Sequence, residues 1–258
     1  MVCFSFTGQA LSHYNHLMNK EIFLSLVIPT YNEAKRLPIT LSEIRPWLDD
    51  QGFVYEVLLM DGKSTDETEA YCRQLRESWP EIEFVPQTER RGKGYCVKVG
   101  CLRGRGKHIL VMDADHPTPI STLALMVPHT KNYDMIVGVR AFCGEEGASG
   151  RGRRIIGLAQ QLLAHIVVFQ QSVADSQCGF KLFSNACAKK LFSRSVIEGG
   201  MYDVELFFIA HRHKIGIYSM PVTWVNKEGS TINLIRCILF DPFSLFYIRW
   251  MGLLGHYN

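Results

Sequence analysis

The segment "HILVMDADHP" (residues 108–117) decides the fold, because an apolar run ends there in two carboxylates, Asp113 and Asp115. A second apolar run, "YEVLLMD" (55–61), ends in the same way at Asp61. Short apolar runs of this kind are typical of strands buried on both faces of a parallel sheet. Ligands of such sheets bind beyond the carboxyl ends of the strands. The two segments therefore predict a binding site at the edge where these strands end.

Further apolar segments predict the rest of the sheet. The predicted strands are 24–30, 55–61, 82–87, 108–115 and 133–140, and helical periodicity predicts helices at 37–49, 66–78, 93–104 and 120–130. This alternation indicates an α/β fold with right-handed crossovers. After residue 150 the pattern changes to a long helix, a strand in "QCGFKLF", a helix near 202–213 and a strand in "IYSMPVTWV". No repeat or linker interrupts the chain, which favours one domain.

Composition excludes several classes of protein. The chain has 258 residues, of which 47% are hydrophobic and 21% are charged, as in ordinary globular proteins and unlike disordered ones. A net charge of +3 is too small to argue for a nucleic-acid partner. The basic clusters at 90–107 and 151–154 suit phosphate groups or an anionic membrane surface. Eight cysteines without a CxxC pair indicate reduced thiols in a cytosolic protein.

The ends of the chain carry weaker signals. Residues 1–21 lack the basic start and apolar core of a signal peptide, so we interpret them as an N-terminal extension. No run of eighteen apolar residues occurs, so no transmembrane helix is expected. Polar residues interrupt the two nearest candidates, 155–174 and 238–255. The second places aromatic residues beside a cation, which fits a helix in the membrane interface and equally a helix that packs on the core.

The acids at the strand ends suggest a metal and nucleotide site. Asp113 and Asp115 are one residue apart, so on a strand they point the same way and reach one cation. Hard oxygen ligands favour Mg²⁺ or Mn²⁺, which bridge to phosphates. Asp61 and Glu33 follow neighbouring strands, where Asp61 is suited to hydrogen bonds with a nucleobase or ribose. The alternative for each acid is a helix N-cap, which fits Asp66 best.

The basic segment "RRGKG" (90–94) follows a predicted strand and opens a predicted helix. Its glycines lack the spacing of a Walker phosphate loop. Lys93 is nevertheless suited to binding a diphosphate.

Seven motifs together resemble those of a known family. They are "VIPTYNE", "DGKSTDET", "RGKG", "MDADHP", "VGVR", "DSQCGFKLF" and "YDVELFFIA". In order and spacing they resemble the family 2 glycosyltransferases with the GT-A fold, and in particular the polyprenyl-phosphate sugar synthases that make dolichyl-phosphate glucose and mannose. The resemblance covers about residues 22–235. It implies a Rossmann-like, mostly parallel sheet flanked by helices, followed by a C-terminal amphipathic segment at 236–258.

The resemblance also implies roles for individual residues. The nucleotide-sugar site would comprise Pro29, Tyr31, Glu33, Asp61, Lys93, Asp113, Ala114 and Asp115, with Mg²⁺ or Mn²⁺ on Asp113 and Asp115. The acceptor phosphate would contact Arg140, Arg151, Arg153 and Arg154. Asp175, Gln177 and Lys181 would line the sugar site, and the catalytic set would be Asp113, Asp115, Arg140 and Arg153. Asp203 and Glu205 would either approach the site or face the helix surface.

The implied reaction is an inverting transfer of a hexose from a UDP- or GDP-sugar to a polyprenyl phosphate, either dolichyl or undecaprenyl. The motifs "QCGFK" and "DVELFF" favour glucose over mannose. A lipid monophosphate is already largely dianionic at neutral pH, so the acceptor needs no side-chain base. The enzyme would be peripheral on the cytoplasmic face of a membrane, which is the endoplasmic reticulum in a eukaryote.

Two other functions fit parts of the sequence. A glycosyltransferase with a hydroxyl acceptor would need a base, for which Asp175 or Asp203 is the candidate. A catalytically inactive nucleotide-sugar binder would fit Gly62, which stands where the family usually has a second acid.

Two further positions depart from the family pattern. Pro117 replaces a glutamine that binds metal in mannose synthases, so water, His116 or a substrate oxygen would complete the metal site. Gly157 replaces a frequent serine near the acceptor arginines. These departures leave the sugar and the metal dependence open.

Overall fold

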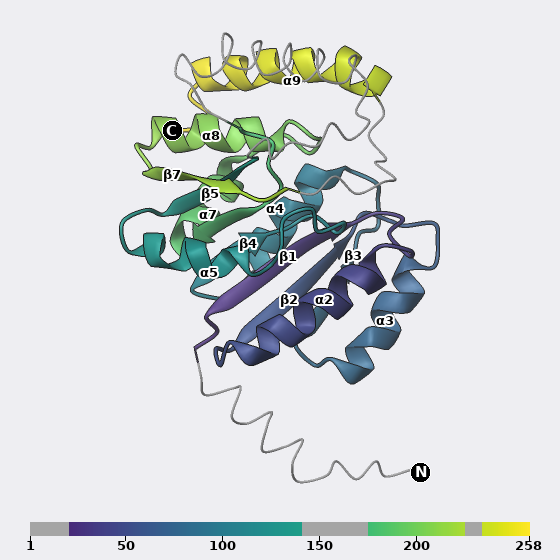
Figure 1. Cartoon of the computed structure of the whole chain (residues 1–258). Helices are drawn as coiled ribbons and strands as arrows, with labels where there is room; N and C mark the ends of the chain where they lie inside the picture. Colours follow the sequence, from purple (N-terminus) through teal and green to yellow (C-terminus); the bar gives the residue numbers. More distant parts are fainter. Residues whose placement is uncertain (1–20, 141–174, 225–233) are drawn as a thin grey trace, which may run out of the picture.

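A single mixed sheet organises the chain (Figure 1). The computed structural model describes residues 21–140, 175–224 and 234–258. In these ranges the strands are β1 (Leu24–Thr30), β2 (Tyr55–Asp61), β3 (Ile82–Pro86), β4 (His108–Val111), β5 (Met135–Arg140), β6 (Lys181–Ser184) and β7 (Ile217–Val222). Their order in the sheet is β3-β2-β1-β4-β6-β5-β7. The predicted α/β architecture with a mostly parallel sheet is confirmed.

The direction of the strands determines where the site forms. Strand β1 pairs in parallel with β2 on one side and with β4 on the other. The carboxyl ends of these three strands therefore lie at one edge of the sheet. Strand β6 is antiparallel to both neighbours, and its first residue, Lys181, pairs with Val111 of β4 and Val137 of β5. The segment that enters β6 consequently reaches the same edge as the loop that leaves β4.

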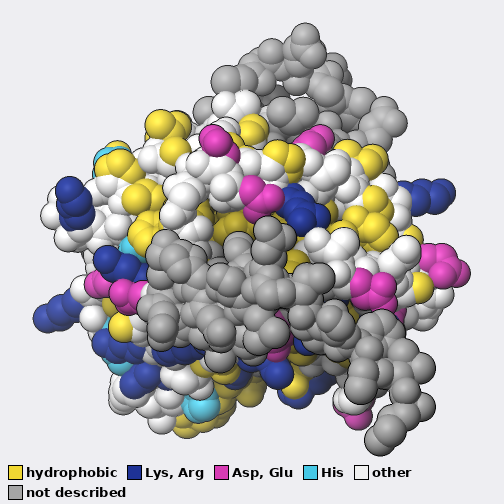
Figure 2. All heavy atoms as spheres, turned by 90° about the horizontal axis from the view of Figure 1, so that it is seen from below, with side chains coloured by type: hydrophobic (Ala, Val, Ile, Leu, Met, Phe, Trp, Pro, Cys, Tyr) yellow, Lys and Arg dark blue, Asp and Glu magenta, His cyan; other side chains and the backbone are white. Residues whose placement is uncertain are grey.

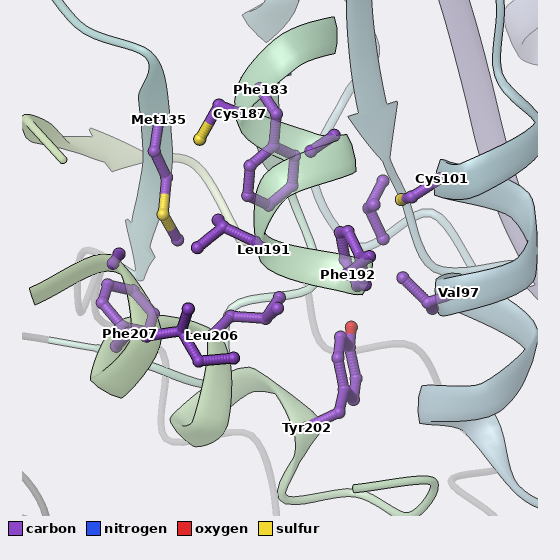
Figure 3. Close-up of a cluster of buried hydrophobic side chains, with 14 of the residues drawn as sticks. Val97, Cys101, Met135, Phe183, Cys187, Leu191, Phe192, Tyr202, Leu206 and Phe207 are labelled. Carbon is purple, nitrogen blue, oxygen red and sulfur yellow. The ribbon is translucent and has the colours of Figure 1, made fainter. Parts of the chain in front are cut away.

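Helices cover both faces of the sheet. Their bounds are α2 (Leu37–Asp50), α3 (Thr68–Ser78), α4 (Lys93–Arg103), α5 (Thr122–Met126), the 3₁₀ helix η1 (Val127–Lys131), α7 (Asn185–Arg194), α8 (Tyr202–Arg212) and α9 (Leu234–Leu253). Alternate residues of β1 enter different cores: Val27 packs with α4, α7 and α8, whereas Leu26 packs with α2 and α3. This alternation explains why a strand that is buried on both faces has a continuous apolar sequence. Figure 3 shows the first core, where Phe183, Leu191 and Phe207 converge.

Two predicted elements differ from the structure, and one helix was not predicted. The strand predicted at 108–115 ends at Val111, because the chain turns over residues 112–116 with His116 at φ 47°. The predicted helix 120–130 is a short α-helix continued as the 3₁₀ helix η1. Helix α7 was not predicted, although the Ser184 hydroxyl caps its start by accepting the Cys187 N–H at 3.2 Å. Asp113 and Asp115, the predicted metal ligands, therefore lie in the turn after β4 and not on a strand.

Helix α9 has one packed side and one exposed apolar side. Leu245 and Ile248 are buried, and a Cβ on Gly252 would approach the Phe208 ring of α8 within 2.6 Å. The exposed side carries large apolar side chains: Phe243, Phe246, Tyr247, Trp250 and Leu253, continued by Leu254. The intervals between them follow the helical period, so they form one stripe. In Figure 1, α9 forms an outer layer beyond α8.

The alternatives predicted for the C-terminal segment were a helix in the membrane interface and a helix that packs on the core. One side of α9 does pack on the core, and the membrane-interface role stays a prediction. Among the helices that the structure describes, none has both the length and the apolar character required to cross a bilayer. The helix predicted at 155–174 lies outside the described residues, as does most of the N-terminal extension.

Candidate active site

The two acids after β4 meet the segment that enters β6. Asp113 Oδ1 is 2.6 Å from Nζ of Lys93, the first residue of α4. A Cβ on Gly179 would lie 2.1 Å from Asp113 Oδ2, so the carboxylate occupies space that any other residue at 179 would fill. Gly179 precedes β6 by two residues, which is why the antiparallel strand can bring it to this point. Sequence reasoning missed this role, although the glycine lies within the quoted "QCGFK" motif.

Glycines also place Lys93 at the site. Gly92 adopts φ 128°, and a Cβ there would lie 2.4 Å from the carbonyl oxygen of Glu198. A Cβ on Gly94 would meet Tyr202 at 2.7 Å. Only glycine permits this approach of the α4 start to the start of α8. The motif "RGKG" therefore seats Lys93 beside Asp113 by close backbone packing.

The charges of this pair support one another. Burial favours the neutral amine of Lys93, but the carboxylates of Asp113 and Asp203 raise its pKa. Burial also favours the neutral acid of Asp113, but the Lys93 ammonium outweighs it and lowers the pKa of Asp113. Asp115 differs, because burial and the nearby Asp113 charge raise its pKa. Asp113 is thus held as an anion, while Asp115 is adjacent to a like charge.

A second cation lies on the other side of Asp115. Arg36 binds both carboxylate oxygens of Glu33, with Nε to Oε2 at 2.7 Å and Nη2 to Oε1 at 2.6 Å. Its remaining terminal nitrogen, Nη1, is 3.7 Å from Asp115 Oδ2. Sequence reasoning did not select Arg36, which lies in the loop "YNEAKRLP" three residues after Glu33. The chain Glu33–Arg36–Asp115 connects the end of β1 with the end of β4.

Asp61 organises its own loop. Its side chain is fully buried and accepts hydrogen bonds from the Thr30 hydroxyl at 3.2 Å and from Ser64, through N–H at 2.9 Å and Oγ at 2.5 Å. Lys63 between them adopts φ 66°, a conformation that favours glycine. The predicted contact of Asp61 with a nucleoside therefore requires one of these hydrogen bonds to be exchanged, and it stays a prediction.

At the end of β5, Arg140 and Asp175 form a bidentate ion pair. Arg140 Nε lies 2.7 Å from Asp175 Oδ2 and Nη2 lies 2.9 Å from Oδ1, and the Arg140 N–H also donates to Oδ2 at 3.1 Å. The Gln177 N–H donates to the same carboxylate at 3.2 Å. Burial opposes ionisation, but Arg140 lowers the pKa of Asp175. The predicted acceptor residue Arg140 therefore lies with two of the three predicted sugar-site residues, Asp175 and Gln177, at the end of β5, whereas the third, Lys181, begins β6 and binds Asp203.

Two acids of helix α8, Asp203 and Glu205, are buried, so of the two alternatives predicted for them a position on the helix surface is excluded. Asp203 binds Lys181 Nζ at 2.7 Å, and Lys181 is itself 1% exposed. Glu205 accepts the N–H groups of Val196 and Ile197 at 2.8 and 2.9 Å. It also accepts the Tyr257 hydroxyl at 2.7 Å. Asp203 thus lies in a buried ion pair near Lys93 and Asp113. Glu205 instead holds the loop before α8 in place.

The remaining predicted residues are placed as follows. Pro29 lies in β1 opposite Met60, and the Ala114 carbonyl accepts the Thr40 hydroxyl at 2.7 Å. The Arg90 guanidinium lies over the Tyr31 ring, 4.1 Å from the ring centroid, in a cation–π contact. Arg151, Arg153 and Arg154 lie outside the described residues.

The donor set fits a divalent cation held by few protein ligands. Asp113 Oδ1 is a buried oxygen without a hydrogen-bond partner, and its contact is the ion pair with Lys93. In the described ranges, no group of three or more His, Cys, Asp or Glu side chains is placed to bind a metal. His116 is also engaged, because Nε2 accepts the Ile120 N–H at 2.8 Å and Nδ1 lies 3.1 Å from Glu43. Two carboxylates with water and diphosphate oxygens are the usual environment of Mg²⁺.

Replacement of Gly179 by alanine tests this geometry. The added Cβ displaces the Asp113 carboxylate, so we expect Gly179→Ala to lose about 100-fold or more in the glycosyl-transfer activity that the sequence motifs predict, while the protein stays folded. The control is Gly199→Ala, since a Cβ there has no atom within 4 Å. Equal activity of the two variants would contradict the close contact between Gly179 and Asp113.

Comparisons with known proteins agree with this geometry. The model of "Glycosyl transferase family 2" matches residues 25–200. The chain belongs to glycosyl transferase family 2. A dolichyl-phosphate beta-glucosyltransferase of Saccharomyces cerevisiae is 32% identical over 97% of this chain and 81% of its own length. The Homo sapiens dolichyl-phosphate beta-glucosyltransferase is 31% identical over 90% of this chain and 76% of its own length.

Solved structures share the fold of this family 2 glycosyltransferase. The glucosyl-3-phosphoglycerate synthase of Mycobacterium tuberculosis, in complex with Mn²⁺, UDP and glucosyl-3-phosphoglycerate, has a TM-score of 0.59 at 18% identity. The match covers 98% of this chain and 86% of that one. The same enzyme bound to phosphoglyceric acid has a TM-score of 0.61 at 19% identity, over 94% of this chain and 86% of that one. At this identity the likeness concerns the fold alone.

Proposed function

We propose that this glycosyltransferase transfers glucose from UDP-glucose to dolichyl phosphate and forms a β-linked lipid-phosphate glucose. The observation that carries the proposal is the similarity to the yeast and human dolichyl-phosphate beta-glucosyltransferases over 97% and 90% of the chain. The choice of UDP over GDP as the donor nucleotide is part of this proposal, and the panel of donors below tests it.

On the donor side, Asp113 and Asp115 would hold Mg²⁺ or Mn²⁺. The bound cation would neutralise charge on the departing nucleoside diphosphate. Lys93 adds a second positive charge, because its ammonium lies within 2.6 Å of Asp113. Lys93 would then lie beside the leaving group as it develops negative charge, and a preorganised cation at that point would stabilise the transition state.

On the acceptor side, the lipid phosphate is the nucleophile. A phosphate monoester with a second pKa near 6 is largely dianionic at neutral pH, so it can attack C1 without a base. Arg140, held by Asp175, would bind this phosphate together with Arg151, Arg153 and Arg154. The guanidinium groups would offset the repulsion between phosphate and diphosphate. One in-line displacement would then invert the configuration at C1.

The two alternative functions are less well supported. A hydroxyl acceptor needs a free base near C1, but Asp175 is paired with Arg140 at 2.7 Å and Asp203 with Lys181 at 2.7 Å. An inactive nucleotide-sugar binder was suggested by Gly62. A Cβ at residue 62 would lie 3.4 Å from its nearest neighbours, which is an ordinary contact distance, so glycine is not required there by packing. The chain still has the two acids proposed to bind the metal, Asp113 and Asp115, so the change at residue 62 alone does not argue for an inactive protein.

A panel of donors tests the proposal. Radiolabelled UDP-glucose, UDP-galactose and GDP-mannose are offered with a short-chain dolichyl phosphate, with Mn²⁺ or Mg²⁺ or with a chelator. We expect a lipid-linked product from UDP-glucose that is lost with the chelator. Transfer only from GDP-mannose would overturn the choice of sugar. Tight UDP binding without any transfer would favour the inactive binder.

The exposed stripe of α9 suggests how the enzyme meets its acceptor. Aromatic side chains are enriched where proteins contact the membrane interface, and a large exposed apolar surface usually marks an interaction site. A helix can lie in that interface without spanning the bilayer. We therefore assign the membrane-facing role to α9, with the enzyme peripheral on the cytosolic face of the endoplasmic reticulum.

The view from below in Figure 2 shows Lys, Arg, Asp and Glu side chains intermixed on a face of the protein.

Substitution within the stripe tests this role. We expect Phe246→Gln/Trp250→Gln to weaken binding to vesicles of phosphatidylcholine and phosphatidylinositol by about 10- to 100-fold, because two exposed aromatic side chains lose their apolar contact with lipid. Co-sedimentation with vesicles measures the effect. The control, Ile39→Gln/Leu125→Gln, removes two equally exposed apolar side chains elsewhere. Equal loss in both variants would show that α9 has no special role.

A further inference from the structure

The arginine between Glu33 and Asp115 has no role in the function proposed so far. The guanidinium of Arg36 has two distinct edges. The Nε and Nη2 edge is directed at the two oxygens of Glu33, at 2.7 and 2.6 Å. The other terminal nitrogen, Nη1, faces Asp115 Oδ2 at 3.7 Å. A planar fork bound at two points has a fixed direction, so Glu33 determines where Nη1 points.

Glu33 is in turn held by the loop that carries it. Its N–H donates to the Thr68 hydroxyl at 2.8 Å, and its carbonyl accepts the N–H groups of Arg36 and Leu37 at 3.0 and 2.9 Å. The Ala34 N–H donates to Asp66 at 3.2 Å. The loop after β1 is therefore tied to the start of α3, and the Glu33 carboxylate is 11% exposed. These backbone hydrogen bonds fix the loop, so the Glu33 carboxylate is held beside Arg36.

We propose that Arg36 is a positioning residue for Asp115, and that Glu33 supports this role by orienting Arg36. Three carboxylates, Glu33, Asp113 and Asp115, lie close enough to affect one another's charge. Lys93 offsets the charge of Asp113, and Arg36 performs the same task for Asp115 from the opposite side. Partners that orient a metal ligand commonly change metal affinity by 10- to 100-fold when they are removed. This inference rests on the proposed function, because it concerns the residue pair that would hold the divalent cation.

Binding measurements distinguish support of the metal site by Glu33 and Arg36 from direct contact of Glu33 with the nucleoside. Mn²⁺ affinity is measured by calorimetry in the presence of UDP, and uridine affinity is measured without metal. If the inference holds, Glu33→Gln and Arg36→Gln each weaken Mn²⁺ binding by about tenfold, and the double variant is no weaker than either alone. The uridine affinity of Arg36→Gln stays within about twofold of the wild type. Arg36→Lys does not restore Mn²⁺ affinity, because an ammonium cannot bind Glu33 with two parallel hydrogen bonds.

The control is Arg73→Gln on α3. Arg73 pairs with Glu69 one helical turn away, with 2.7 Å between Nη2 and Oε1, and this pair is not part of the candidate site. A tenfold loss of uridine affinity in Glu33→Gln, with Mn²⁺ binding intact, would make Glu33 a nucleoside contact and overturn the inference. Tighter Mn²⁺ binding in Arg36→Gln would overturn it too, because Arg36 would then compete with the metal. Failure of the proposed function has a different signature, since the wild-type protein itself would transfer no glucose.

Discussion

Asp115→Asn should abolish transfer while leaving the fold intact. The substitution keeps the shape of the side chain but removes the charge that would hold the divalent cation, and loss of several kcal/mol of charge stabilisation corresponds to about 10³-fold or more in rate. Asp115 is partly exposed in the turn after β4, so we expect the free energy of unfolding to change by less than about 1 kcal/mol. Radiolabelled transfer from UDP-glucose gives the rate, and thermal melting followed by circular dichroism gives the stability.

The matched control for that experiment is Asp50→Asn, which neutralises an exposed carboxylate at the end of α2. It should retain full activity and stability. Wild-type activity in Asp115→Asn would refute the assignment of Asp115 to the metal site. Loss of activity that merely follows loss of folded protein would leave the chemistry with another residue.

The largest effect on stability is expected at Lys181. Its ammonium is 1% exposed, donates to the Cys178 carbonyl and lies 2.7 Å from Asp203. Lys181→Met leaves the Asp203 charge buried without its partner, which costs about 3–5 kcal/mol. For a chain of this size the melting temperature should fall by roughly 6–20 °C. Differential scanning calorimetry or chemical denaturation measures the change.

Two further variants test the cause. Lys181→Met/Asp203→Leu removes both charges and should recover much of the lost stability, because paired buried charges can be replaced by apolar residues at little cost. Lys190→Met, on the exposed side of α7, should change stability by less than about 0.5 kcal/mol. If Lys181→Met melts like the wild type, the Lys181–Asp203 pair is not part of the structural support of the site.

The sheet was predictable because its strands are buried on both faces, which makes their sequences continuous apolar runs. The predicted strands 24–30 and 55–61 agree exactly with β1 and β2. The end of β4 was misplaced, since Met112 and Ala114 are also buried and extend the apolar pattern beyond the last paired residue, Val111. Sequence period alone does not show where hydrogen bonding between strands stops.

The site was predictable in its acids and less so in the partners of those acids. Asp113 and Asp115 were recognisable from their position after an apolar run. Arg36 and Gly179 were not, because their roles depend on contacts between the ends of different strands. The sequence left open whether Asp203 and Glu205 face inward or outward, because charged residues are usually exposed, and only the structure shows that both are buried.

The reversed strand β6 divides the sheet into two parts with separate tasks. Residues proposed for the nucleotide come from β1, β2 and β4, whereas Arg140 and Asp175 adjoin β5 on the far side of β6. The parts join along β6, which pairs with β4 and β5, and Asp113 lies against the backbone of Gly179 just before that strand. With the roles proposed above, a lineage could exchange one recipient lipid for another by altering the second half alone, provided that the contact between Asp113 and Gly179 is left untouched.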